Sequence, residues 1–256
     1  MIAQDHPGHG ESIDHPEHLG HFGSRNGWKY LLQSIAATQE FLHQQFKDIP
    51  FFFFGHSMGS FATLSYLEQA MIKTNLHTNG LPLKGVILSG STQNPWYLDR
   101  SLHLLAKFET WRQGQKGQSA LINALTFQSF NRKFKPTRTD VDWLSRDQQA
   151  VDQYINDPLC GTQSSNQSWK DFAEGLIQTF KRNNLKKLPH VPFLLISGDQ
   201  DPLSDHGGFH RLEVSLQKAG IQSIKAQTFA HGRHELLNET NHKEVEDLIF
   251  HWIKDC

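Results

Sequence analysis

The stretch that decides the fold is Phe51-Phe52-Phe53-Phe54-Gly55-His56-Ser57-Met58-Gly59. Four consecutive phenylalanines are typical of a short strand that is covered on both faces. After this stretch the apolar residues recur at steps of three and four, as on one face of a helix: Phe61, Leu64, Leu67 and Met71. The sequence therefore predicts a strand, a sharp turn and a helix, with Ser57 at the tip of the turn.

A serine in such a turn is typical of a nucleophile. Gly55 and Gly59 would let the strand and the helix approach closely, which exposes the hydroxyl of Ser57. The turn also directs the backbone N–H of Met58 towards an oxyanion that develops during acyl transfer. The G-x-S-x-G pattern alone is weak, because it should occur by chance in roughly one chain in ten of this length. The strand before it and the helix after it favour the nucleophile interpretation.

The composition is that of a globular protein. Apolar residues make up 37% of the 256 residues, and the net charge is −1 without a basic run, so nothing favours nucleic-acid binding. Cys160 and Cys256 lie too far apart for a disulfide framework or a zinc site, which fits a reducing cytoplasm. No apolar run is long enough to span a membrane. We expect a cytoplasmic protein without a cofactor.

Histidines are over-represented near the start of the chain, in a loop rich in glycine and proline. They could suggest a metal site, but no cysteine or tight cluster of carboxylates accompanies them. We therefore predict that the chain binds no metal through these residues: His6, His9, His15, His18 and His21.

Strand and helix patterns alternate along much of the chain, which predicts an α/β fold with a mainly parallel sheet. Residues 1–5 read as the end of a strand, and the apolar pattern of 25–47 is that of an amphipathic packing helix. The remaining expected elements are strands at 83–90, 191–196 and 224–229 and helices at 207–220 and 241–253.

Residues 92–189 interrupt this alternation. They contain no convincing strand, and they are too apolar and aromatic for a linker. We predict a helical cap over the strand ends, inserted into a core of residues 1–91 and 190–256. Most of the cap aromatics should pack cap against core, and a minority should line a binding site. Within the cap, the acidic stretch 140–147 is interpreted as helix capping and a salt bridge.

Two loops after the later strands carry candidate partners for Ser57. Asp199 and Asp201 follow the strand at 191–196, and either could orient a histidine or merely cap its own turn. His231 and His234 follow the last strand. The chain order serine, aspartate, histidine is found in one class of hydrolases and favours His234 as the general base, with His231 as the alternative.

Four stretches together resemble the α/β-hydrolases: Asp5–Ser12, Gly55–Ser60, Ser197–Pro202 and Arg233–Glu239. More narrowly, the chain resembles the bacterial branch of lysophospholipases and monoacylglycerol lipase-like enzymes, which are grouped with the S33 serine aminopeptidases. The resemblance implies that Asp201, directly before a proline, is the acid and that His234 is the base. It further implies hydrolysis of a lipid-like ester, such as a monoacylglycerol or a lysophospholipid, through an acyl-enzyme, with transient membrane contact through the cap.

The resemblance departs at the front of the chain. Relatives carry further strands before the residues that match 1–5, and a His-Gly loop among them supplies the second oxyanion N–H. We therefore expect an N-terminally truncated core or a start codon placed too far downstream. Two alternatives stay open. One is a serine aminopeptidase with the same triad and an acidic group for the substrate's ammonium. The other is a truncated, catalytically impaired product.

Overall fold

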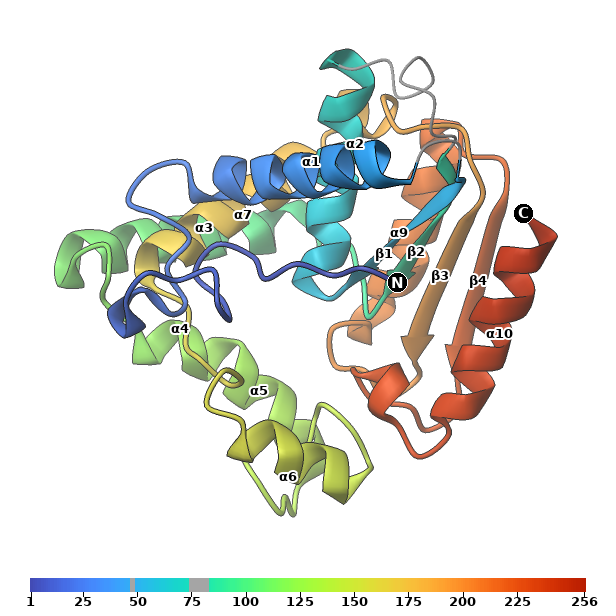
Figure 1. Ribbon diagram of the computed structural model, residues 1–256. Coiled ribbons are helices and arrows are strands. Elements are labelled where there is room, and N and C mark those ends of the chain that lie inside the picture. Colours follow the sequence, from blue (N-terminus) through green and yellow to red (C-terminus); the bar gives the residue numbers. More distant parts are fainter. Residues whose placement is uncertain (47–48, 74–82) are drawn as a thin grey trace.

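A parallel β-sheet forms the centre of the protein. The structure is a computed structural model that describes residues 1–46, 49–73 and 83–256. In this part of the chain four strands lie in the order β1-β2-β3-β4, and each pairs in parallel with the next. Figure 1 shows them side by side. The mainly parallel sheet is confirmed, with the bounds Phe51–His56, Leu83–Ser89, Phe193–Gly198 and Ile224–Phe229.

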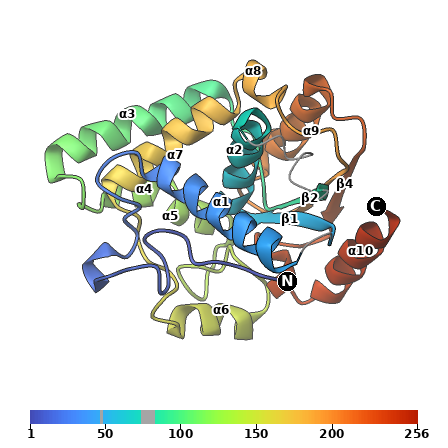
Figure 2. The same cartoon turned by 45° about the horizontal axis from the view of Figure 1, so that its top comes forward.

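Helices cover both faces of this sheet, as the alternation of patterns predicts. The helices expected at 25–47, after the serine turn, at 207–220 and at 241–253 are all present within the described residues. Figure 2 shows α10 on the opposite side of the sheet from α1 and α2. Their bounds are α1 Gly27–Gln45, α2 Met58–Lys73, α9 Gly208–Ala219 and α10 His242–Asp255.

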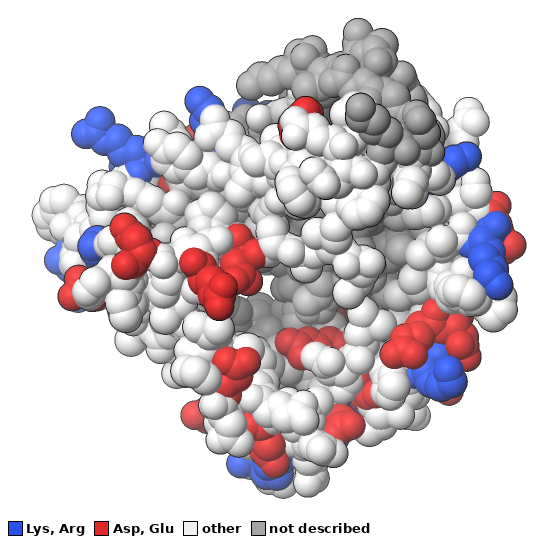
Figure 3. All heavy atoms as spheres, viewed as in Figure 1, with Lys and Arg blue, Asp and Glu red and all other residues white. Residues whose placement is uncertain are grey.

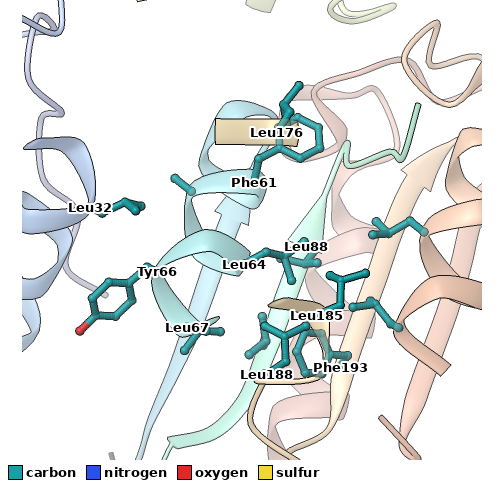
Figure 4. Packing of buried hydrophobic residues seen from close by; sticks show 14 of the residues in the cluster. Leu32, Phe61, Leu64, Tyr66, Leu67, Leu88, Leu176, Leu185, Leu188 and Phe193 are labelled. Atoms are coloured by element: carbon teal, nitrogen blue, oxygen red, sulfur yellow. The ribbon is translucent and has the colours of Figure 1, made fainter. Parts of the chain in front are cut away.

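The two faces of the sheet carry separate apolar clusters, because successive strand side chains point to opposite sides. Leu88 and Phe193 pack with the α2 residue Leu64, and Figure 4 shows them on one side of the sheet. Ile87 and Leu194 belong to the other cluster, with residues of α10. This two-sided burial explains the continuous apolar runs of β2 and β3.

Strand β1 is less covered than its four phenylalanines suggest. Phe51, Phe52 and Phe53 are partly buried, and Phe54 is 39% exposed, so the expectation of a strand buried on both faces is wrong. Among the described residues β1 pairs with β2 only, and its other edge has no neighbouring strand.

The strand expected at residues 1–5 is also wrong. These residues are irregular, and the side chain of Gln4 bonds to α1, where its Nε2 donates to Ser34 Oγ at 2.8 Å and its Oε1 accepts from Thr38 Oγ1. A strand is stable only beside a partner that accepts its ladder of hydrogen bonds. None of the four described strands pairs with residues 1–5.

Residues 92–189 are helical, as expected, and the structure describes no strand among them. Helices α3 and α7 pack along each other, and α6 lies at the far end of the segment (Figure 1). Asp147 caps α6 by accepting the backbone N–H of Gln149 at 2.8 Å, which confirms the capping interpretation of the acidic stretch. The division into core and cap stays a prediction. The bounds are α3 Trp96–Gln113, α4 Ala120–Leu125, α5 Phe127–Asn131, α6 Gln148–Asn156, α7 Asn166–Thr179 and α8 Arg182–Leu185.

The turn between β1 and α2 places Ser57 in the left-handed region, with φ of 50°, which is unusual for a residue with a Cβ. A Cβ on Gly55 would lie 2.6 Å from the Gly59 carbonyl oxygen and 2.7 Å from the Cα of Ser60. Gly55 is therefore needed for the close approach of strand and helix. At Gly59 an added Cβ would have no described heavy atom within 4 Å, so the expectation that both glycines are needed is wrong for Gly59.

This difference gives a matched test of the turn. Gly55→Ala should lower the free energy of unfolding by about 1–3 kcal/mol, because backbone atoms of α2 must move. Gly59→Ala should raise it by about 0.5–1 kcal/mol, because alanine favours the helical conformation that Gly59 already adopts. Urea unfolding of both variants measures this. Equal effects of the two substitutions would contradict the account of the turn.

Candidate active site

Three candidate residues follow three different strands at the same end of the sheet. Ser57 follows β1, Asp201 follows β3 and His234 follows β4. In a parallel sheet the carboxyl ends of the strands meet at one edge, so residues far apart in sequence come together there.

Asp201 and His234 form a buried pair. His234 Nδ1 lies 3.0 Å from Asp201 Oδ2, and the residues are 2% and 0% exposed. The backbone N–H of Leu203 donates to Asp201 Oδ1 at 2.9 Å. Burial acts to raise the pKa of Asp201, but the charge of His234 and these hydrogen bonds outweigh it and hold the pKa below its usual value. An ionised Asp201 fixes the tautomer with the proton on Nδ1, which leaves Nε2 free to accept a proton.

The alternative residues lie outside this pair. Asp199 is exposed, and its backbone N–H donates to the Phe229 carbonyl at 3.1 Å. His231 is also exposed. From the chain order the sequence favoured His234, and from the family resemblance it favoured Asp201. The geometry brings these two residues together.

Ser57 lies beside a cavity, at the start of α2. Its backbone N–H donates to the Ser89 carbonyl at 2.9 Å, which holds the turn against β2. Met58 is the first residue of α2, so its N–H has no acceptor within the helix and lies at the positive end of the helix dipole. In the described residues no hydrogen bond joins Ser57 to His234. Catalytic hydrogen bonds are often long without substrate and shorten when it binds.

Two residues that the sequence did not single out complete the surroundings of His234. The ring of His56 lies 4.7 Å from the ring of His234, centroid to centroid. Burial of its ring, with a contribution from the charge of His234, lowers the pKa of His56 to about 3, so His56 is neutral at neutral pH. Gly90 follows β2 with φ of 56°, and a Cβ there would lie 2.9 Å from Cε1 of His234. The glycine at the end of the 83–90 run was the only signal of this contact.

A cavity of about 750 Å³ has Ser57 and Met58 in its wall. Most of its other lining is apolar or aromatic and comes from residues 92–189, with Asp99 as a buried carboxylate in the wall. The apolar lining includes Leu102, Leu105, Phe127, Trp169 and Phe172. The arrangement can hold an apolar group next to a serine hydroxyl.

The aromatic residues of α3 differ from the expectation that most of them pack cap against core. Tyr97 lines the cavity, but Trp96, Phe108 and Trp111 are 69%, 50% and 81% exposed. A helical pattern shows which residues share one face of a helix. It does not show whether that face is covered, because the covering helices come from distant parts of the chain.

The histidine-rich loop is held by ordinary polar contacts. His21 Nδ1 lies 2.9 Å from Ser165 Oγ, and His18 Nε2 lies 3.0 Å from Lys116 Nζ. The described residues contain no group of three or more histidine, cysteine or acidic side chains placed to bind a metal ion.

No helix among the described residues is long and apolar enough to cross a membrane. On the face shown in Figure 3, acidic side chains border a hollow, and lysine and arginine side chains lie mostly near the outline.

Solved structures with the same fold come from several organisms. A carboxyl esterase from Bacillus coagulans is 24% identical, with a TM-score of 0.82 over 98% of this chain and 79% of that one. A monoglyceride lipase from Saccharomyces cerevisiae is 17% identical, with a TM-score of 0.69 over 98% and 75%. A monoacylglycerol lipase from Paleococcus ferrophilus is 20% identical, with a TM-score of 0.63 over 96% and 79%. A search of curated proteins by sequence found no match.

The sheet, its flanking helices and these structural neighbours define an α/β-hydrolase fold. A family model described as serine aminopeptidase, S33, matches residues 1–241, and the chain belongs to this family of hydrolases. The family resemblance found in the sequence is therefore confirmed.

The contact at Gly90 gives a test of the His234 geometry. Gly90→Ala would put a methyl group against the imidazole and displace it from Asp201, so hydrolytic activity should fall about 100-fold. Gly161→Ala is the matched control, because Gly161 has φ of 70° but its added Cβ would lie 3.6 Å from Tyr154, with no candidate residue within 4 Å. Both substitutions should lower stability by about 1–2 kcal/mol. Equal activity of the two folded variants would contradict the geometry.

Proposed function

We propose that the protein is a serine ester hydrolase that cleaves lipid-like carboxylic esters through an acyl-enzyme. One observation carries the proposal: a largely apolar cavity has Ser57 and the N-terminus of α2 in its wall, at the edge of the sheet where Asp201 and His234 form a buried pair. Names of the structural neighbours support ester chemistry, since they include an esterase and monoglyceride lipases.

The proposed reaction has two steps with the same base. His234 Nε2 takes the proton of Ser57 as its Oγ attacks the ester carbonyl, and the carbonyl oxygen gains negative charge near the Met58 N–H. The alcohol leaves with the proton held by His234, and the acyl group stays on Ser57. Water then attacks the acyl-enzyme with His234 again as the base, the bond between the acyl group and Ser57 Oγ breaks, the carboxylic acid leaves, and Oγ takes back the proton from His234. Asp201 keeps the imidazole in the required tautomer throughout.

The cavity favours a substrate with an apolar acyl chain. Its volume of about 750 Å³ lies in the range of small-molecule sites, and its lining gives apolar contact on several sides. A monoacylglycerol or a lysophospholipid supplies such a chain together with a polar head group. These are the substrate classes that we propose.

A second candidate is an aminopeptidase that uses the same three residues. One observation favours it: Asp99, 4% exposed, lines the cavity and accepts a hydrogen bond from Asn94 Nδ2 at 3.0 Å. A carboxylate there could bind the ammonium of a peptide. Burial raises the pKa of Asp99, however, which weakens this role because burial disfavours the charged form that would bind an ammonium.

The central test is turnover of a monoacylglycerol by purified protein. Ser57→Ala should lower kcat by at least about a thousandfold, because removal of a nucleophile leaves only residual transition-state binding. Ser223→Ala is the control, since Ser223 is exposed just before β4, at the opposite end of the sheet. Undiminished turnover by Ser57→Ala would contradict the proposal.

The same preparation separates the alternatives. Faster hydrolysis of an aminoacyl amide than of the glyceryl ester would favour the aminopeptidase. No turnover of either by folded wild-type protein would favour a catalytically impaired product.

A further inference from the structure

The loop that carries His234 lies against residues 142–146, which are about 90 positions earlier in the chain. The backbone N–H of His234 donates to the Trp143 carbonyl at 3.4 Å, and the N–H of Glu235 donates to the Leu144 carbonyl at 2.8 Å. These bonds join the two segments at the residue proposed as the base and at the next one.

Side chains strengthen this contact on both sides. Arg233 donates from Nη1 to the carbonyl of Ser145 at 3.1 Å and to that of Asp142, and its guanidinium lies 4.2 Å from the ring centre of Phe134. In return, Ser145 Oγ donates to the Asn238 carbonyl at 2.7 Å. The loop is therefore held by Phe134 and by residues 142–146, before and after His234.

Glu239 is the most enclosed group in this contact. It is 0% exposed, and its Oε1 accepts the backbone N–H of Arg233 at 2.9 Å and that of Arg146 at 3.1 Å. Its Oε2 accepts from Arg146 Nε at 2.9 Å and from the Thr240 N–H at 3.0 Å. Each oxygen thus accepts one bond from Arg146 and one from the chain around His234. One carboxylate therefore fixes the distance between residues 142–146 and the His234 loop.

The imidazole of His234 is held from several directions as a result. The ring of Trp143, 6% exposed, lies 4.9 Å from it at an interplanar angle of 34°. The ring of His56 lies 4.7 Å from it, and Asp201 bonds to Nδ1. Of these neighbours, only Trp143 comes from residues 92–189, and its backbone belongs to the segment that Glu239 holds.

We propose that Glu239 is a positioning residue for the general base: by fastening the His234 loop to residues 142–146, it keeps the imidazole against Asp201 and under Trp143. This inference rests on the proposed function, in which His234 is the base. It makes the helical segment part of the machinery that aligns the base, in addition to its part in lining the cavity.

A carboxylate suits this role better than an amide. All four partners of Glu239 are donors, and both of its oxygens accept two bonds. In Glu239→Gln the amide nitrogen, itself a donor, would replace one oxygen and face the two donors that this oxygen now accepts. Those two hydrogen bonds would be lost. Glu239→Asp keeps both acceptors on a shorter side chain and should restore part of the alignment.

The experiment compares Glu239→Gln, Glu239→Asp and a control, Arg138→Ala. Arg138 forms an exposed ion pair with Asp152 at 2.6 Å in the same helical segment, without contact to the His234 loop. We expect kcat for ester turnover to fall about 100-fold in Glu239→Gln, with partial recovery in Glu239→Asp. KM should stay within about threefold of wild type, because Glu239 does not line the cavity. Arg138→Ala should behave as wild type.

A second readout does not depend on turnover. The proton on Nδ1 of His234, in its bond to Asp201, should give a far-downfield proton NMR signal that His234→Ala lacks. Glu239→Gln should lose or broaden this signal, and Arg138→Ala should keep it. If Glu239→Gln does not fold, Trp143→Ala provides the same two measurements, with Trp143→Phe as its conservative partner.

The outcomes separate the two proposals. A wild-type protein that shows the NMR signal but hydrolyses no ester contradicts the proposed function only. A folded Glu239→Gln variant with wild-type kcat and an unchanged NMR signal overturns the positioning role, even when Ser57→Ala is inactive. A fall in kcat that Arg138→Ala shares to the same extent overturns it as well.

Discussion

The left-handed backbone at Ser57 is the constraint on which the site depends. A residue with a Cβ adopts φ of 50° only where its surroundings hold it. Here Gly55 allows α2 to lie directly against β1, and the bond from the Ser57 N–H to Ser89 ties the turn to β2. As a result, the hydroxyl of Ser57 and the N–H of Met58, the first of α2, lie in the wall of the same cavity.

The rest of the sheet supplies the partners of this turn. Asp201 follows β3 and His234 follows β4, and parallel pairing brings both to the end of the sheet at which β1 ends. Gly90 leaves room for the imidazole where β2 ends. Each of the four strands is therefore followed by one of these residues at the same edge, and loss of any one pairing would separate the residues of the proposed site.

Much of this arrangement could be predicted because it has a local signal. The apolar runs that became β2 and β3 indicate strands buried on both faces, and their spacing with helical patterns indicates a parallel sheet. The order of Ser57, Asp201 and His234 along the chain indicates a hydrolase site. Family resemblance added the preference for Asp201, which the buried pair with His234 supports geometrically.

What could not be predicted depends on contacts between distant segments. The space around Gly59 depends on which neighbours pack against that side of α2. The irregular residues 1–5 bond to α1 through Gln4, although one edge of β1 has no neighbouring strand. The bonds of Glu239 to Arg146 join positions 93 apart in the chain. The sequence led us to expect a salt bridge for the stretch 140–147, and the structure shows that Arg146 of this stretch pairs with the distant, buried Glu239. Sequence periodicity carries no information on such pairings.

The helical segment 92–189 contacts the site in two ways. Its apolar side chains line the cavity beside Ser57, and residues 142–146 hold the loop of His234. In the proposed mechanism, this one segment would both contact the substrate and help to align the base.

The most direct measurement of the central claim is the site of covalent attack by a fluorophosphonate with an alkyl chain. Such a reagent reacts with a serine only when a neighbouring base activates it. Mass spectrometry of the labelled and digested protein should find one adduct, on Ser57, and none in His234→Ala. An adduct on another residue, or no adduct on folded wild-type protein, would contradict the account.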